Sequence, residues 1–502
     1  MTEMNTSLTG APTAKEMSWD LIPWDKANFE VKRLQMRIAK ATREKRFGKV
    51  RALQRLLTHS FYGKAIAVKR VTQNKGSKCP GIDGIIWRTK RQKMQAILSI
   101  KRLGYKSQPL RRIYIPKKNG LRPLSIPSMK DRAMQSLHLL SIEPIAETIA
   151  DKNSYGFRPK RSTADAIEQC CICLSKKNSA KWIFEGDIKS FFDSVSFDWL
   201  EDNILMDKVI LKKFLRAGYI EKTNLEATSK GFPQGSPISP ALALLALSGL
   251  EGKLAKEFKG SRNKIHVIIY ADDFVITGES KEMLETKVTP LVEQFLAERG
   301  LQLSREKSRI THISQGFDFL GFHIRKYGKK QKFLTKPTKA SIKDFLADIK
   351  TTIRLNFGSS TEKLIQVLNP KITGWCNYYR HSASSKIFSY IDNRIYKMLD
   401  RWARKRHYNK GFRWIYQKYF QRHGSSRRWQ FHAKVKNDKG NITYFNLKLA
   451  SDTKIKRHIK IRGEAHPYDP SFLEYFRKRE EYKVVLPTVM GSNRVCQGLI
   501  NA

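Results

Sequence analysis

The order of apolar and polar positions divides the chain into a helical beginning, a mixed middle and a helical end. Residues 28–57 carry apolar side chains at helical spacing, with Lys or Arg on the opposite face. The apolar positions are Val31, Leu34, Ile38, Val50, Leu53 and Leu57. After a Gly/Pro-rich loop at residues 79–84, short apolar strands alternate with amphipathic helices as far as about Lys326. That alternation predicts an α+β core.

The pattern becomes purely helical beyond about Thr335. Helical spacing is kept by Ile342, Phe345, Leu346, Ile349 and Ile353. A second helical stretch, at residues 364–368, is expected to end at Asn369 and Pro370, because proline cannot donate the backbone hydrogen bond that continues a helix. We interpret this part of the chain as a separate helical module.

Residues 401–470 combine many Lys and Arg with few Asp and Glu. Aromatic residues are interleaved with these cations: Trp402, Tyr408, Trp414, Tyr416, Trp429 and Phe431. This composition suits contact with phosphates and stacking on bases. We expect at least half of these aromatic side chains to be buried, because the segment needs apolar residues of its own to fold.

The net charge is +51, from 96 Lys and Arg against 45 Asp and Glu. Such an excess repels itself unless a polyanion is the usual partner, and nucleic acid is the first candidate. The longest apolar run, residues 241–247, is far shorter than the ~20 residues of a membrane span, so no membrane partner is expected. The first seventeen residues resemble neither a signal nor a transit peptide, which predicts a cytoplasmic protein. The six cysteines lack paired CxxC spacing and are expected to be reduced and mostly buried.

Two adjacent carboxylates, Asp272 and Asp273, stand between the apolar runs at residues 266–269 and 274–276. The runs predict two buried strands, and the turn between them would project both carboxylates at one end of a sheet. Paired carboxylates in such a place need a cation, and divalent ions suit oxygen ligands and phosphoryl chemistry. The alternative is a solvated Asp–Asp turn.

A site for two ions ~3.5–4 Å apart needs a further carboxylate from another strand. Asp187 is the candidate, since it follows the strand-like residues 181–184 and comes just before a position where a helix can begin. The alternative for Asp187 is a capping role at the start of that helix.

Residues 185–193 (EGDIKSFFD) and 270–273 (YADD) resemble the palm of a reverse transcriptase, specifically the bacterial group II intron-encoded kind often called a maturase. Further blocks are similar to this family in the same order. They are residues 80–84, 114–124, 153–159, 231–240, 303–307, 317–322 and 374–379. The similarity extends from residue 19 to residue 475.

The resemblance implies an α+β right-hand polymerase of fingers and palm, followed by an α-helical thumb or maturase X domain and a small basic DNA-binding segment. We expect a basic helical extension at residues 1–75, fingers and palm at 76–330, thumb or X domain at 331–425, the DNA-binding segment at 426–475 and a degenerate tail at 476–502.

The same resemblance implies roles for individual residues. Asp187, Asp272 and Asp273 would be catalytic and hold two Mg²⁺, with Asp273 supporting one ion or the hairpin itself. The nucleotide site would consist of Lys117, Arg122, Phe192, Gln234 and Lys307. Within it, Lys117 and Arg122 would hold the triphosphate, and the Phe192 ring would collide with a ribose 2′-hydroxyl. The primer end would be supported by Phe319, Leu320, Gly321 and Phe322.

The expected activity is RNA-directed DNA synthesis from deoxynucleotides. The expected partners are the protein's own group II intron RNA, which it would help to splice and copy during retrohoming, and a DNA target and primer. Lys32, Arg33 and Arg37 would contact the RNA phosphates, together with the X domain.

Many relatives continue into an HNH nuclease with paired CxxC motifs. Here Cys496 is the only cysteine and no His follows residue 470, so we expect no complete nuclease. Two alternatives stay open: a domesticated reverse transcriptase in repair or phage defence, and an RNA-binding splicing factor without polymerisation. The intact carboxylates argue against the second alternative.

Overall fold

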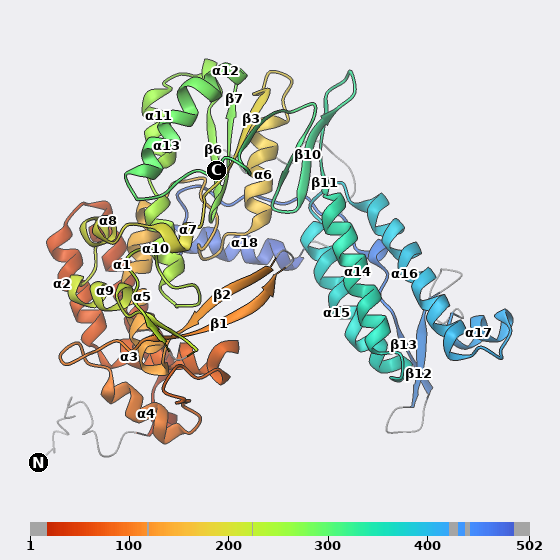
Figure 1. Ribbon diagram of the computed structural model, residues 1–502, viewed down its shortest axis with the longest axis horizontal. Coiled ribbons are helices and arrows are strands. Elements are labelled where there is room, and N and C mark those ends of the chain that lie inside the picture. The colour runs from red at the N-terminus through yellow and green to blue at the C-terminus, as the bar shows by residue number, and fades with distance from the viewer. Residues whose placement is uncertain (1–17, 118–119, 223, 421–429, 437–441, 486–502) are drawn as a thin grey trace, which may run out of the picture.

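The computed structural model describes residues 18–117, 120–222, 224–420, 430–436 and 442–485. In the view of Figure 1, the palm sheet and its covering helices lie at the top, the N-terminal helices and a small fingers sheet lie below them, and a group of long helices lies to the right. The mixed α+β core followed by a helical module agrees with the apolar pattern.

The N-terminal helices are α1 (Trp24–Arg43), α2 (Phe47–His59) and α3 (Phe61–Gln73), and they pack against α5 (Met129–Ile149). All six apolar positions predicted between residues 28 and 57 are buried in this layer. The helical pattern is divided between α1 and α2 at Lys45, whose φ of 55° lies in the left-handed region and ends the first helix.

The fingers contain a sheet with the strand order β2-β1-β4-β5. Its strands are β1 (Leu110–Lys117), β2 (Gly120–Ile126), β4 (Tyr219–Glu221) and β5 (Asn224–Glu226). The predicted β1–β2 hairpin is present, with Lys117 opposite Gly120. Residues 118 and 119 lie outside the described part of the chain.

The palm is an antiparallel sheet with the order β6-β7-β3-β8, and helices cover both of its faces. Its strands are β3 (Trp182–Asp187), β6 (His266–Tyr270), β7 (Asp273–Gly278) and β8 (Arg309–His312). One face, including Phe184 and Phe274, joins the core that contains α10 (Ser239–Leu247) and α13 (Thr289–Ala297). The other face, including Ile183, joins a second core with α6 (Thr163–Leu174).

Shorter helices surround this sheet: α4 (Lys90–Ser99), α7 (Phe191–Ser194), α8 (Phe197–Asn203), α9 (Lys208–Leu215), α11 (Leu250–Glu257) and α12 (Lys281–Met283).

The second core continues into the helical module. The connection is a sheet of β9 (Phe317–Phe319), β10 (Phe322–Tyr327) and β11 (Lys332–Pro337), followed by α14 (Lys339–Leu355), α15 (Thr361–Tyr379) and α16 (Ser385–Arg406). Four of the five predicted apolar positions of α14 are buried, and Ile342 is partly buried against the same core.

The predicted helix end at Asn369 and Pro370 is wrong, because α15 runs through Pro370 to Tyr379. Two interactions offset the missing backbone donor of the proline. The Asn369 side chain donates to the Asn446 carbonyl at 3.1 Å and accepts from the Lys448 amide at 2.7 Å. Apolar side chains beyond the proline, including Cys376, are buried in the core. Tertiary packing therefore overrides the local preference.

The chain then forms α17 (Phe412–Tyr419), the hairpin β12 (His432–Lys436) with β13 (Ile442–Asn446), a strap of residues 447–472, and α18 (Leu473–Val485). Among the described aromatic residues of this region, Trp402 and Phe431 are buried and Tyr416 is partly buried, whereas Tyr408 is 91% exposed. Trp429 lies outside the described residues, as do residues 486–502 of the expected tail. The helix α18 begins before residue 475, so the boundary expected there divides a helix.

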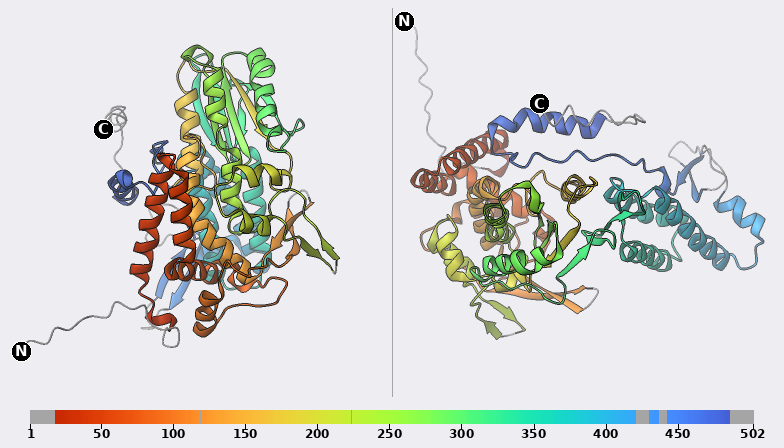
Figure 2. Two further views of the ribbon diagram at one scale, coloured as in Figure 1. Left: turned by 90° about the vertical axis from the view of Figure 1, so that its left-hand side faces the viewer. Right: turned by 90° about the horizontal axis from the view of Figure 1, so that it is seen from above.

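The strap runs back from the helical module to the N-terminal helices (Figure 2). It is attached to the palm mainly at Asp165 of α6, whose carboxylate is fully buried. This carboxylate accepts hydrogen bonds from His458 Nε2 at 2.9 Å and from the Ile461 amide and Arg479 Nη2, both at 2.8 Å. Burial alone would raise the pKa of Asp165, but these donors hold it well below its usual range.

None of the helices in the described ranges combines the length and the apolar character needed to cross a membrane.

Candidate active site

The two strands that flank the paired carboxylates form the predicted hairpin. In the antiparallel pair β6–β7, Tyr270 lies opposite Asp273, which leaves Ala271 and Asp272 as the two residues of the turn. Ala271 has a φ of 58°, in the left-handed region that tight hairpin turns require. The turn thus places Asp272 beyond the last paired residues of the sheet.

Asp187 is the last residue of β3 and pairs with Asp273 across the ladder. Directly opposite residues of an antiparallel pair point to the same face, so these two carboxylates are neighbours. The pKa of Asp273 is raised to about 6, first by desolvation and then by the charges of Asp272 and Asp187, while Lys307 opposes the rise. Because Asp273 is exposed, we take crowding by the two carboxylates as the cause that the geometry supports. The structure therefore places the three predicted carboxylates at the same end of the palm sheet.

The segment at residues 304–308 binds both the backbone and the carboxylate of Asp187. The Ser304 amide donates to the Asp187 carbonyl at 2.8 Å, and the Asp187 amide donates to Ser308 Oγ at 3.3 Å. Lys307 Nζ lies 3.1 Å and 3.4 Å from the two carboxylate oxygens of Asp187. In this structure the Lys307 ammonium thus supplies the positive charge next to the carboxylates.

A segment to which the sequence analysis gave no role supports the turn that contains Asp272. The Tyr155 amide donates to the Ile269 carbonyl at 2.9 Å, which places Gly156 directly against the turn. A Cβ atom on Gly156 would lie 2.2 Å from the Ala271 nitrogen, so only glycine fits. Next to it, Arg158 forms a buried ion pair with Glu147 at 2.8 Å. Residues 153–159 already resembled the family, but the need for a glycine there becomes visible only in the folded structure.

Phe192, on α7 and five residues after Asp187, lies in an aromatic cluster. Its ring centroid is 5.3 Å from that of Phe232 and 6.0 Å from that of Phe157, both in edge-to-face geometry. Phe192 is half-buried, whereas its neighbour Phe191 is fully buried. The Phe232 amide also donates to the Phe192 carbonyl at 2.7 Å. These contacts fix the ring while part of it stays accessible.

The loop that contains Gln234 joins the palm to the fingers. The Ser125 amide, near the end of β2, donates to the Gln234 carbonyl at 2.8 Å. Gly235 has a φ of 108°, and a Cβ atom there would lie 2.9 Å from Leu124 Cδ1. Arg122 is exposed on the same strand, β2. Lys117 ends β1, and its side chain lies outside the described part of the structure.

The residues predicted to support the primer form the β9–β10 hairpin. Phe319 and Phe322 face each other across the ladder and are buried, so they belong to the core. Leu320 and Gly321 form the turn, with φ values of 51° and 78°, and both are partly exposed. Only this turn, within the predicted set of four, offers surface to a ligand.

Lys32, Arg33 and Arg37 are all exposed on α1, opposite its buried face. Arg33 donates to Glu30 at 2.7 Å. Arg37 borders a shallow cavity of about 290 Å³ that is otherwise lined mainly by basic side chains, among them Lys40 and Arg46. This part of α1 therefore presents a positive surface away from the carboxylates.

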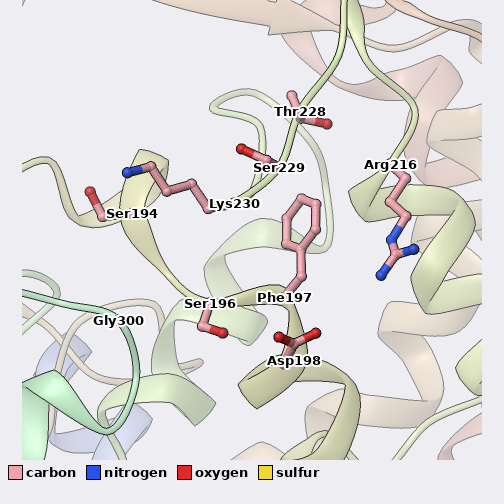
Figure 3. A pocket seen from close by; sticks show the side chains of 9 residues that line it. All are labelled: Ser194, Ser196, Phe197, Asp198, Arg216, Thr228, Ser229, Lys230 and Gly300. Carbon is pink, nitrogen blue, oxygen red and sulfur yellow. The ribbon is translucent and has the colours of Figure 1, made fainter.

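A larger cavity, of about 500 Å³, lies beside the start of α8 and is lined mostly by polar residues (Figure 3). It lies between Ser196, Lys230 and Arg216, and none of the three carboxylates lines it. We therefore do not assign the chemistry to this cavity.

The carboxylates suit a divalent metal ion by their chemistry, since they provide oxygen donors and concentrated negative charge. Within the described ranges, no group of three or more His, Cys, Asp or Glu side chains is gathered closely enough to enclose a metal ion.

Comparisons with known proteins agree with this geometry. The family described as reverse transcriptase (RNA-dependent DNA polymerase) matches residues 115–324, the N-terminal domain of reverse transcriptase matches 19–100, and the group II intron maturase-specific domain matches 342–420.

Two curated relatives extend the comparison. Protein YkfC of Escherichia coli is 32% identical over 355 residues, covering 60% of this chain and 91% of YkfC. The group II intron-encoded protein LtrA of Lactococcus lactis is 27% identical over 421 residues, covering 65% of this chain and 70% of LtrA. A telomerase from Candida albicans aligns in three dimensions with a TM-score of 0.37 and 13% identity, over 63% of this chain and 67% of that chain.

Proposed function

The chain belongs to the group II intron-encoded reverse transcriptases and maturases, and from this premise we propose that Asp187, Asp272 and Asp273 are the carboxylates of its polymerase site. The protein is an RNA-directed DNA polymerase. The observation that carries the residue assignment is the pairing of Asp187 with Asp273 beside the turn that contains Asp272.

Reverse transcriptases use divalent metal ions, and we propose two Mg²⁺ held by these carboxylates. Bound there, the ions would lower the pKa of the primer 3′-hydroxyl and neutralise charge on the triphosphate and the departing pyrophosphate. The protein's own contribution is to hold the carboxylates in register and to keep Lys307 beside them. A cation that replaces Lys307 at Asp187 would release the ammonium group to approach a phosphate.

The remaining pocket residues would select and orient the nucleotide. The exposed part of the Phe192 ring would exclude a 2′-hydroxyl, and its aromatic neighbours prevent it from turning aside. Gln234 would contact the nucleotide from a loop fixed to the fingers by Ser125. Arg122 and Lys117 would hold the triphosphate, and the turn at Leu320 and Gly321 would support the primer end.

A matched pair of variants tests the carboxylate assignment. Asp272→Ala should abolish extension of a DNA primer on an RNA template while leaving the affinity for RNA largely intact. Asp202→Ala, on an exposed position of α8, removes the same charge elsewhere and should keep normal activity. Synthesis by Asp272→Ala at the rate of the Asp202→Ala control would refute the assignment.

We further propose that the protein binds its parent intron RNA, assists splicing and copies the RNA during retrohoming. The positive surface formed by Lys32, Arg33 and Arg37 supports this role, together with the helical module matched by the maturase-specific domain. The basic segment at residues 426–475 would contact the DNA target, within the domain boundaries expected from the sequence. Co-purification of one specific RNA, lost in a triple Ala variant of these three residues, would test the RNA assignment.

A further inference from the structure

The turn between β9 and β10 contains backbone strain that neighbouring residues must hold. Leu320 and Gly321 both have positive φ values, 51° and 78°, and for leucine this left-handed conformation is strained. The strained turn is also the part of the proposed primer support that reaches the surface. The residues that bind this turn therefore determine where a primer end can lie.

Two tyrosines of the helical module hold this turn. The Tyr378 hydroxyl donates to the Leu320 carbonyl at 2.9 Å, and the Tyr379 hydroxyl donates to the Gly321 carbonyl at 3.2 Å. The Thr338 amide adds a third hydrogen bond, to the Gly321 carbonyl at 3.0 Å. A Cβ atom on Gly321 would lie 2.8 Å from the Tyr379 hydroxyl oxygen, so glycine makes this approach possible. Both carbonyls of the turn are thus bound from α15.

Aromatic stacking connects the same tyrosines to the palm and to α14. The Tyr378 ring stacks on Phe322 with centroids 5.4 Å apart, and the Tyr379 ring lies 4.8 Å from Phe322. Tyr379 also lies 4.5 Å from Trp375, which stacks on Phe345 at 4.9 Å. Stacking positions the rings of Tyr378 and Tyr379 so that their hydroxyls can donate to the carbonyls of the turn. Replacing a hydroxyl by hydrogen should therefore leave the packing in place.

Tyr378 also lies beside the catalytic hairpin and the start of α6. Burial raises the pKa of Tyr378, a hydrogen bond with Thr163 opposes the rise, and the neighbouring Tyr379 and Tyr270 add to it. Tyr270 is the first residue of the YADD stretch, at the end of β6. The Tyr378 side chain thus binds the primer-supporting turn and lies near the start of α6 and the end of β6.

We propose that Tyr378 and Tyr379 form a palm–thumb joint that positions the primer 3′ end relative to the carboxylates. The joint rests on the proposed function, because it assigns the turn at Leu320 and Gly321 to the primer. The tyrosines are positioning residues and act through the two carbonyls that they bind. Without the hydroxyls, the strained turn relaxes and the primer end is displaced from the proposed carboxylate site.

The test compares Tyr378→Phe, Tyr379→Phe and the double variant with Tyr390→Phe, an exposed position of α16. The expected result for the double variant is about a tenfold lower kcat for adding the first nucleotide, as a sub-ångström displacement predicts. The KM for the deoxynucleotide should stay unchanged, because the residues proposed to bind it are not altered. Tyr390→Phe should behave as the unaltered protein.

Hydrogen exchange separates failure of the joint from failure of the proposed function. Amide exchange at residues 319–322 should accelerate in the double variant and stay unchanged in Tyr390→Phe. Faster exchange with unaltered kcat would overturn the primer role of the turn, and unaltered exchange would overturn the joint itself. If the unaltered protein extends no primer at all, the proposed function fails, and the exchange result still decides whether the tyrosines hold the turn.

Discussion

Gly156 offers the sharpest test of how the catalytic turn is held. A Cβ atom at Gly156 would lie 2.2 Å from the Ala271 nitrogen and 2.9 Å from its Cα. Ordinary van der Waals contact begins at 3.4 Å, so Gly156→Ala requires a movement of about 1.2 Å. Gly156 does not have a positive φ, so the substitution adds no backbone strain of its own.

The turn should move rather than the segment that contains Gly156. That segment is fixed by the hydrogen bond from the Tyr155 amide to Ile269 and by the buried pair of Arg158 with Glu147. The turn consists of only two residues, and one of them is Asp272. Displacement of a reacting group by about 1 Å costs about 100-fold in rate, or roughly 2.7 kcal/mol in the barrier.

Single-turnover addition of one deoxynucleotide to a primer on an RNA template measures this effect directly. Gly156→Ala should react about 100-fold more slowly, with RNA affinity unchanged and the free energy of unfolding lowered by about 1–3 kcal/mol. Gly374→Ala is the matched control, because a Cβ atom there meets nothing within 4 Å. A Gly156→Ala protein that reacts within twofold of the control would refute the argument that this contact sets the position of Asp272.

Three further outcomes follow from buried or packed groups. Arg158→Ala should lower the free energy of unfolding by about 3–5 kcal/mol in urea denaturation, because it leaves Glu147 buried and unpaired. Replacing both Arg158 and Glu147 by apolar residues should lower it much less. Equal losses in the single and the double variant would contradict the reasoning. Phe192→Val should raise ribonucleotide incorporation relative to deoxynucleotide incorporation by at least about tenfold, and unchanged selectivity would remove Phe192 from the sugar site. Burial lowers the pKa of His138 to about 4, so His138 stays neutral in the folded protein at pH values where the unfolded chain, with a pKa near 6.5, is already protonated. The free energy of unfolding should therefore fall as the pH drops from about 6.5 towards 4, by about 2 kcal/mol at pH 5. In His138→Gln the free energy of unfolding should depend less on pH in the same urea denaturation assay.

Patterns that depend on neighbours in sequence were predicted well. The apolar runs around Asp272 and Asp273 specified a hairpin, because alternation and turn chemistry act within a few residues. The burial of the N-terminal helices followed from helical spacing alone. Pro370 shows the limit of such reasoning, since a helix continues through it when distant residues such as Asn446 provide hydrogen bonds.

Contacts between distant segments could not be read from the chain. The sequence analysis assigned no role to Asp165, and its partners His458 and Arg479 lie 293 and 314 residues away. Residues 447–472 were interpreted only as part of a basic segment, although several of their groups bind the palm. The composition of a segment gives its number of charged residues but does not show which of them are buried against the palm.

The position of the carboxylates depends on supports from three separate parts of the chain. Gly156 lies against the turn that contains Asp272, and Ser304 and Ser308 form hydrogen bonds with the backbone of Asp187. The helix α6 covers one face of the sheet, and the strap and α18 bind it at Asp165. Each support uses backbone atoms or a buried side chain, so each tolerates little change in geometry. Repulsion among the carboxylates would otherwise push Asp187, Asp272 and Asp273 apart, as the raised pKa of Asp273 indicates. If the three carboxylates form the proposed polymerase site, their concentrated negative charge needs rigid surroundings. Residues as distant in sequence as Gly156 and Arg479 are then expected to affect the same reaction.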